Sequence, residues 1–247
     1  MLNETFYLDG IDARSAGIQL QAPIEFSEAV PVVEAQTIPG RNGDLIWETG
    51  NYENRSAEAE CFCLQKDVEK AISSAGRFLM GKKGYRRLET SDDPDHYWMA
   101  RVENSPKIAM RLRTLAPFEI GFDCKPQRFL KSGDDPIVIS VPNAEETHIS
   151  IYNPYGFTSH PLIEIQSGTS DNAPCIISCN KRKCKVNRLI ETMFLDSDIQ
   201  NAYNERGNQN HNITCTDFIV LEPGENDFSV FSTAPLTVKI TPRWWEL

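Results

Sequence analysis

The sequence predicts a mainly β protein with two domains. Many short runs alternate apolar and polar residues, turn-forming residues separate them, and only one stretch has a helical period. A further observation is the ending Pro242-Arg243-Trp244-Trp245. Because leaving a tryptophan in water forgoes roughly 1.5–3 kcal/mol of burial free energy, we expect this terminus to dock as the last strand of a sheet. The alternative is an exposed aromatic patch that awaits a partner.

The bulk composition is that of a soluble globular protein. The 247 residues suffice for one large or two ordinary domains. With 25 Lys and Arg against 35 Asp and Glu, the net charge is -10, which argues against binding to a nucleic-acid backbone. No secretory signal and no apolar run approaching the ~18 residues of a membrane span is visible. The seven cysteines are odd in number, so we expect reduced thiols.

The first 130 residues are expected to form strands and one helix. The helix is predicted over Leu64–Leu79, because apolar residues recur on one face at helical spacing. Asp67 lies near its start, and Gly81 is a plausible C-cap. The apolar face consists of Val68, Ala71, Ile72, Ala75 and Leu79.

Strand-like runs lie around this helix and fill the second half. In the first half they are Thr5–Leu8, Gly17–Leu20, Leu45–Trp47, Glu58–Cys63, Tyr85–Leu88, Tyr97–Val102 and Phe118–Cys124. In the second half they are His148–Tyr152, Leu162–Gln166, Cys175–Cys179, Lys183–Val186, Leu189–Leu195, Asp217–Leu221, Phe228–Phe231 and Leu236–Ile240. Many short strands at near-regular spacing predict a β-sandwich for residues 147–247.

Two polar stretches interrupt the strand pattern. Residues 131–146 hold a short apolar run, Ile137–Val141, between two turn-rich segments, so we place a linker with an internal strand there. Asn201–Asn210 is polar throughout and is predicted to be a surface loop. The expected domains are therefore residues 1–130 and 147–247.

The residue types that commonly form catalytic or metal-binding sites show no recognisable motif in this sequence. The four histidines lack paired metal spacing. Cys175, Cys179 and Cys184 could suggest zinc, but on a strand the first two would lie about 13 Å apart, too far for one ion. No nucleophile elbow and no phosphate loop appears. We therefore expect neither an enzyme nor a cofactor.

Several segments, in order, resemble one family. These segments are Ile38–Leu45 with the following Tyr52 and Arg55, Leu88–Ala100, Phe118–Pro126, Leu195–Ser197, Leu221–Asn226 and the Pro242–Trp245 ending. Each is weak alone, but their order and spacing across the chain are specific. The chain resembles the distal tail proteins (Dit) of long-tailed, non-contractile bacteriophages and prophages.

The resemblance implies an architecture and a structural role. Residues 1–130 would be a tail-tube-like β-sandwich with one helix, six copies of which close into a ring around the tail channel. Residues 147–247 would be a galectin-like β-sandwich. The ring would connect the tail tube to the tail-tip hub and host-adhesion device at the virion tail tip. The implied partners are further copies, the major tail tube protein, the tail-associated hub protein and tail fibre or receptor-binding proteins. DNA would only pass through the channel, and no membrane insertion is implied.

Two loops are candidate contact surfaces. Gly40, Arg41, Asn42 and Gly43 form a turn that needs positive φ at its glycines, and we expect it at the ring interface; a plain hairpin turn is the alternative. The residues Tyr203, Asn204, Glu205 and Arg206 are candidates for a tail-tip partner, against a solvated connector.

Two further expectations concern charge and sugar binding. A six-fold ring would carry six times -10, that is -60, and part of this acidity would line the bore. The alternative function is a carbohydrate-binding host-recognition module. Trp98, Trp244 and Trp245 could then be stacking platforms, whereas core packing is the simpler role for each.

Overall fold

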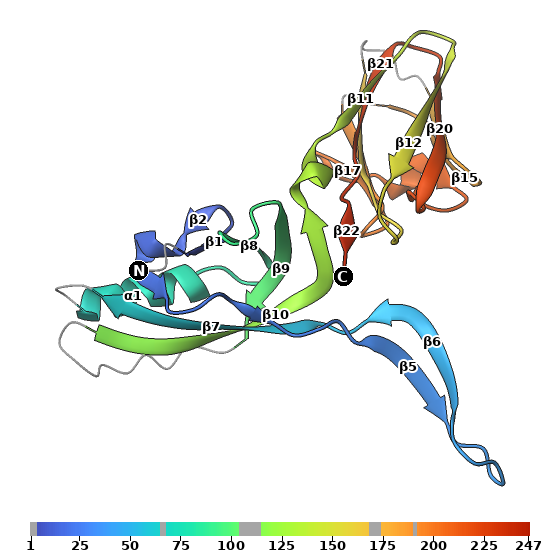
Figure 1. Cartoon of the computed structure of the whole chain (residues 1–247). Coiled ribbons are helices and arrows are strands. Elements are labelled where there is room, and N and C mark those ends of the chain that lie inside the picture. Colours follow the sequence, from blue (N-terminus) through green and yellow to red (C-terminus); the bar gives the residue numbers. More distant parts are fainter. Residues whose placement is uncertain (1–3, 65–67, 104–114, 168–173, 190–191) are drawn as a thin grey trace. The chain divides into compact units, whose positions relative to one another are not determined.

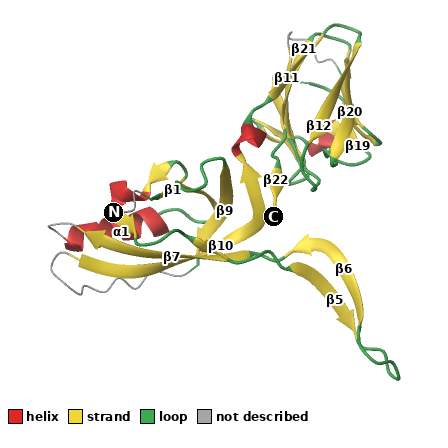
Figure 2. Ribbon diagram, viewed as in Figure 1, coloured by secondary structure: helices red, strands yellow, loops and turns green. Residues whose placement is uncertain are grey.

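The computed structural model describes residues 4–64, 68–103, 115–167, 174–189 and 192–247 (Figures 1 and 2). It divides into two units. Unit 1 comprises Met1–Arg128 with Leu247, and unit 2 comprises Phe129–Glu246. The fold is mainly β, and the described residues contain one α-helix, so the predicted fold class is confirmed. That helix is not long and apolar enough to span a membrane.

Unit 1 is built on a sheet of antiparallel strands in the order β2-β1-β8-β9-β10-β7-β3, with β4 also paired to β7. Along β8 (Arg86–Thr90), buried and half-buried residues alternate, because one face covers the core. Phe6 and Phe122 meet edge to face in that core, with ring centroids 5.9 Å apart. The strands are β1 (Phe6–Leu8), β2 (Ile11–Asp12), β3 (Ile18–Leu20), β4 (Glu25–Phe26), β7 (Arg55–Leu64), β8 (Arg86–Thr90), β9 (His96–Val102) and β10 (Leu115–Leu130).

The helix α1 spans Val68–Met80 and packs on this core. Ala71, Ala75 and Leu79 are buried, as the helical spacing predicted. The predicted start was wrong, because Leu64 is the last residue of β7. The expected capping residue Asp67 lies outside the described residues. A 3₁₀ helix, η1 (Ala13–Ala16), contacts α1.

A second sheet of unit 1 has only two strands, β5 (Pro31–Gln36) and β6 (Leu45–Tyr52). The sequence indicated the start of β6 but not β5. The two strands pair from Gln36↔Leu45 to Pro31↔Tyr52, with an irregularity near Pro31. They form a hairpin that extends from the rest of unit 1 (Figures 1 and 2).

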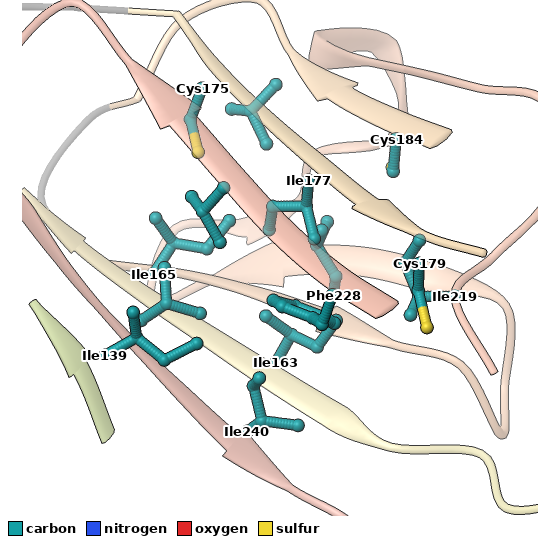
Figure 3. Close-up of a cluster of buried hydrophobic side chains, with 14 of the residues drawn as sticks. Ile139, Ile163, Ile165, Cys175, Ile177, Cys179, Cys184, Ile219, Phe228 and Ile240 are labelled. Atoms are coloured by element: carbon teal, nitrogen blue, oxygen red, sulfur yellow. The ribbon is translucent and has the colours of Figure 1, made fainter. Parts of the chain in front are cut away.

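Unit 2 is a sandwich of two antiparallel sheets. One has the order β11-β21-β13-β16-β17-β18, and the other β12-β20-β14-β15-β19. Figure 3 shows side chains of both sheets meeting between them, including Ile163, Ile177 and Phe228, which are fully buried. The strands are β11 (Ile137–Val141), β12 (Glu146–Asn153), β13 (Leu162–Ser167), β14 (Cys175–Cys179), β15 (Arg182–Val186), β16 (Thr192–Asp196), β17 (Asn201–Asn204), β18 (Gly207–Asn208), β19 (Ile213–Cys215), β20 (Gly224–Ser232) and β21 (Leu236–Thr241).

Three segments of unit 2 differ from the expectation. Residues 131–146, expected as a linker, lie within unit 2, because Ile137–Val141 pairs with β21 as strand β11. The expected loop Asn201–Asn210 contains the hairpin β17–β18 and the start of the 3₁₀ helix η3 (Asn210–Asn212). Asp217–Leu221 is not a strand; only Leu221 forms an isolated bridge, with Ser159.

The C-terminus docks onto unit 2, as predicted. Trp245–Glu246 forms strand β22, and the Leu130 N–H donates to the Trp244 carbonyl at 2.9 Å. Trp244 is buried in the core of the sandwich. The Trp245 ring stacks on Phe157 with centroids 4.4 Å apart, and its Nε1 donates to the Thr158 carbonyl at 3.0 Å. The aromatic ending therefore closes unit 2.

Gly133 provides a test of this docking. Its carbonyl accepts from the Arg243 N–H at 2.8 Å. A Cβ at Gly133 would overlap the Trp244 backbone nitrogen and lie 3.1 Å from the Arg243 carbonyl carbon. Because backbone atoms cannot rotate away, we expect Gly133→Ala to lower the free energy of unfolding by roughly 1–3 kcal/mol. Urea denaturation followed by tryptophan fluorescence measures this, and Gly156→Ala, where a Cβ meets no atom within 4 Å, is the control.

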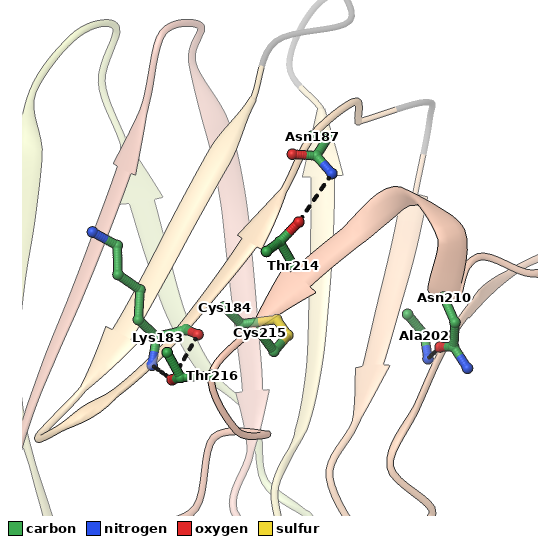
Figure 4. The surroundings of a disulfide bond; sticks show 8 residues. All are labelled: Lys183, Cys184, Asn187, Ala202, Asn210, Thr214, Cys215 and Thr216. Carbon is green, nitrogen blue, oxygen red and sulfur yellow. Dashed lines mark hydrogen bonds between the residues drawn. A yellow bond between two sulfur atoms is a disulfide. The ribbon is translucent and has the colours of Figure 1, made fainter.

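The expectation that all seven cysteines are reduced thiols was wrong for one pair. Cys184 on β15 and Cys215 on β19 lie directly opposite each other, with Cα atoms 4.0 Å apart, and form a disulfide (Figure 4). The other five cysteines are free and buried. Burial raises the pKa of Cys61 and Cys175 to about 12, so these thiols stay protonated and behave as small core residues.

The disulfide should stabilise unit 2. It closes a segment of 31 residues and links the edge strand β19 to β15. We expect the pair Cys184→Ser and Cys215→Ser, or reduction, to lower the free energy of unfolding by roughly 2–4 kcal/mol through the freed chain entropy. Denaturation of the oxidised and reduced chain measures the difference. An equal stability of both forms would contradict a structural role for this bond.

Candidate functional site

The β5–β6 hairpin exposes apolar side chains on both of its faces. Ile46 is 60% exposed and Trp47 50% exposed, and successive strand residues point to opposite faces. Val33 on β5 is 50% exposed as well. A two-stranded hairpin without a packed face is marginally stable in water at best, and clustered exposed apolar groups mark interaction sites. The geometry therefore suits a hairpin that packs against another surface.

The tip of this hairpin carries the predicted loop. Gly40 has φ +82 and Gly43 φ +80, which confirms the predicted positive-φ turn. The Arg41 N–H donates to the Ile38 carbonyl at 3.1 Å, and Thr37 bridges to Asp44 across the base of the loop at 2.8 Å. All residues from Gly40 to Gly43 are exposed. The loop thus exposes a guanidinium and backbone groups at the tip of the hairpin.

An acidic strip lies on the exposed face of the unit 1 sheet. Glu60 on β7 is directly opposite Glu119 on β10, and Glu58 is directly opposite Glu25 on β4. All four side chains are exposed. Like charges placed directly opposite each other destabilise a sheet, so this strip does not serve the stability of the single chain. Glu60 and Glu119 also line a shallow groove with Gln21.

The second predicted loop lies on unit 2, in the β17–β18 hairpin. Tyr203 stacks on Phe194 with centroids 5.3 Å apart, so its ring has a packing role. Asn204 accepts from the Arg206 N–H at 2.9 Å and shapes the turn. Glu205 and Arg206 are exposed. The loop is therefore a short hairpin with Glu205 and Arg206 exposed at its turn, rather than an irregular connector.

The stretch Leu88–Ala100 holds a charged network with a structural role. The Asp93 carboxylate meets the Arg128 Nη2 at 2.5 Å and the His96 Nδ1 at 2.7 Å. Burial alone would raise the pKa of Asp93, but the hydrogen bonds from His96 and Arg128 outweigh it and lower the pKa. The Trp98 ring is buried and stacks on Phe26 with centroids 4.1 Å apart. This network fixes the turn before β9 against β10.

The side chains considered for sugar and metal binding make structural contacts within the chain. Trp98 and Trp244 are buried, and one face of Trp245 covers Phe157. Cys184 is taken up by its disulfide. In the described part of the chain, no group of three or more His, Cys, Asp or Glu residues could hold a metal ion.

Comparison with known proteins places this geometry in a known fold. No protein-family model matches the sequence, and no curated protein matches it. The structure is similar to "SPP1 Dit", described as "a Paradigm of Hub Adsorption Apparatus in Gram-positive Infecting Phages". That match has a TM-score of 0.67 and 17% identity and covers 99% of both chains. The chain has the Dit fold.

A second solved structure also matches both units. A chain in "the Phage P2 Baseplate in its Activated Conformation with Ca" matches with a TM-score of 0.52 and 8% identity. The match covers 97% of this chain and 98% of that chain. Both units therefore belong to one Dit-fold chain. At such identities the backbone arrangement is shared while most side chains differ, so the role of each surface has to be argued from this chain's own residues.

Proposed function

We propose that this chain is a structural component of a phage tail tip, whose copies close into a hexameric ring. The observation that carries the proposal is the β5–β6 hairpin, which exposes Ile46 and Trp47 on opposite faces. A second copy is the simplest partner that buries both faces, because a hairpin reaching onto its neighbour repeats the same heterologous contact around a ring. The Dit fold of SPP1 Dit supports a role in an adsorption apparatus.

In this proposal unit 1 forms the ring and the loop from Gly40 to Gly43 lies at the contact between copies. Arg41 would meet acceptor groups of the neighbour, since no ion pair of its side chain occurs within the described residues. Unit 2 projects from the ring, and Glu205 and Arg206 face tail-tip proteins. The ring connects the tail tube to the hub protein and to tail fibre or receptor-binding proteins, at the tail tip of the virion.

The acidic strip would line the bore of the ring. Glu58, Glu60 and Glu119 repel a phosphate backbone, so DNA passes without adhering. This assignment explains why like charges lie directly opposite each other on β7 and β10. A ring whose channel wall lacks these three carboxylates would contradict it, even if the ring itself forms.

Light scattering and electron microscopy of the pure chain, and of the chain mixed with its tail-tube partner, test the proposal. We expect a particle of about 170 kDa, six times the chain mass of 27.9 kDa, with six-fold symmetry and an axial hole. A purely monomeric chain in both preparations would contradict the ring.

A further inference from the structure

The outer face of the five-stranded sheet of unit 2 is divided by charge. On β15, Lys183 and Lys185 point outward and are exposed, with Lys181 before the strand and Arg188 after it. Residues 181–188 contain five of the chain's 25 Lys and Arg residues and no Asp or Glu, in a protein of net charge -10. We call Lys181, Lys183, Lys185 and Arg188 the basic row.

The other side of the same face is acidic. Glu146 on β12 and Glu225 and Asp227 on β20 point outward, and the Asp227 side chain is 82% exposed. His148 lies between two of them, 3.7 Å from Glu146 and 3.9 Å from Asp227. Ser150 donates to Glu225. We call Glu146, Glu225 and Asp227 the acidic row.

The two rows lie on strands that are not neighbours in the sheet. Strand β14 lies between β20 and β15, and its outward residues Ile176 and Ser178 are uncharged. Two strand spacings separate the backbones of the two rows by roughly 10 Å. Among the described residues, the side chains of the basic row form no ion pair, whereas the neighbouring Arg182 pairs with Asp217 at 3.5 Å.

We propose that the rows meet between copies, the basic row of one unit 2 lying against the acidic row of the next. A second copy supplies the complementary charge, whereas a nucleic acid would be repelled by the acidic row and the net charge. The contact repeats around a ring when each copy turns its basic row to one neighbour and its acidic row to the other. The inference rests on the proposed ring, to which it adds a second belt of contacts made by unit 2.

Zero-length carbodiimide cross-linking tests this contact. Equal amounts of ¹⁴N- and ¹⁵N-labelled full-length chain are mixed and cross-linked at low and high salt, and the linked peptides are identified by mass spectrometry. We expect mixed-isotope links from Lys183 or Lys185 to Glu225 or Asp227. The Debye screening length falls from about 10 Å at 0.1 M salt to about 3 Å at 1 M, so attraction between exposed charges weakens. The yield of these links should therefore fall about fivefold or more at 1 M salt.

A charge exchange provides the control. The Lys183→Glu/Lys185→Glu variant and the Glu225→Lys/Asp227→Lys variant should each lose the contact, as measured by links from the unchanged Lys181 and Glu146. The four-fold variant carries both changes, keeps the net charge of -10 and should restore these links. Lys83→Glu, an exposed lysine of unit 1, should leave them unchanged. Thermal melting confirms that each variant is folded.

The outcomes separate this inference from the ring. If the ring forms but the mixed-isotope links are absent, or if the four-fold variant does not restore the contact, the inference is overturned and the ring stands. If the links form without a ring, the contact is supported and the hexamer is contradicted. Absence of both the links and the ring overturns both proposals.

Discussion

Replacing Trp47 by serine is expected to weaken each contact between neighbouring copies by roughly 2–4 kcal/mol, about 30- to 800-fold in the dissociation constant. Trp47 is a large apolar side chain that is 50% exposed in the single chain and would be buried by a neighbour. Because a closed ring repeats the contact six times, this loss should convert rings to monomers at micromolar concentration. Sedimentation velocity of the variant and the wild-type chain measures the change.

The same substitution should have little effect on the single chain. Trp47 belongs to a sheet of two strands, so removing its ring should change the free energy of unfolding by less than about 0.5 kcal/mol. Ile199→Ser is the matched control, because Ile199 is 60% exposed and lies on unit 2. If the Trp47 variant assembles as well as this control, the hairpin is not the ring contact.

The longer strands of unit 2 could be predicted because one face of each is buried. Along β14 and β21, buried and half-buried residues alternate, so the apolar period of two appears in the sequence. The hairpin partner β5 lacks that signal because it has no buried face in the single chain. The hairpin could therefore not be recognised from apolar alternation. The lack of a buried face, which removes that alternation, is also what makes the hairpin a candidate interface.

The disulfide was missed for a different reason. Cys184 and Cys215 are 31 residues apart, and their pairing depends on the register of β19 against β15. A three-residue edge strand such as β19 has too little period to fix a register from sequence alone. The turn at the hairpin tip was easier to predict than the disulfide, because it depends on neighbouring residues alone. Gly40 and Gly43 do adopt the positive φ that this turn requires. Their place at a ring interface remains a proposal.

The candidate loop on unit 2 was only partly predictable. Asn201–Asn210 is polar, and polarity predicts exposure, which holds for Glu205 and Arg206. Its strands are stabilised by asparagine side chains instead of apolar alternation. Asn208 donates to Asn201, and Asn210 accepts from the Ala202 N–H, each at 2.7 Å (Figure 4 shows the second bond). Such side-chain hydrogen bonds depend on the folded geometry and leave no period in the sequence.

Replacing Arg243 by methionine is expected to lower the free energy of unfolding by roughly 3–5 kcal/mol. Its guanidinium donates to both carboxylate oxygens of Asp196, with Nη1–Oδ1 at 2.7 Å and Nη2–Oδ2 at 3.0 Å. Burial alone would lower the pKa of Arg243, but the hydrogen bonds and charge of Asp196 raise it, so the cation is retained. Without it, the Asp196 side chain, 9% exposed, becomes a buried charge lacking its counterion.

Two further variants separate this cause from loss of packing. Arg243→Lys keeps the charge but not the two-pronged hydrogen bonding, so we expect an intermediate loss. Arg243→Met combined with Asp196→Leu removes both charges and should recover much of the stability, since replacing a whole buried ion pair by apolar groups is often neutral. Urea denaturation of all four chains measures the differences. If the double variant is less stable than Arg243→Met alone, an unpaired Asp196 charge is not the cause of the loss, and the ion-pair explanation is contradicted.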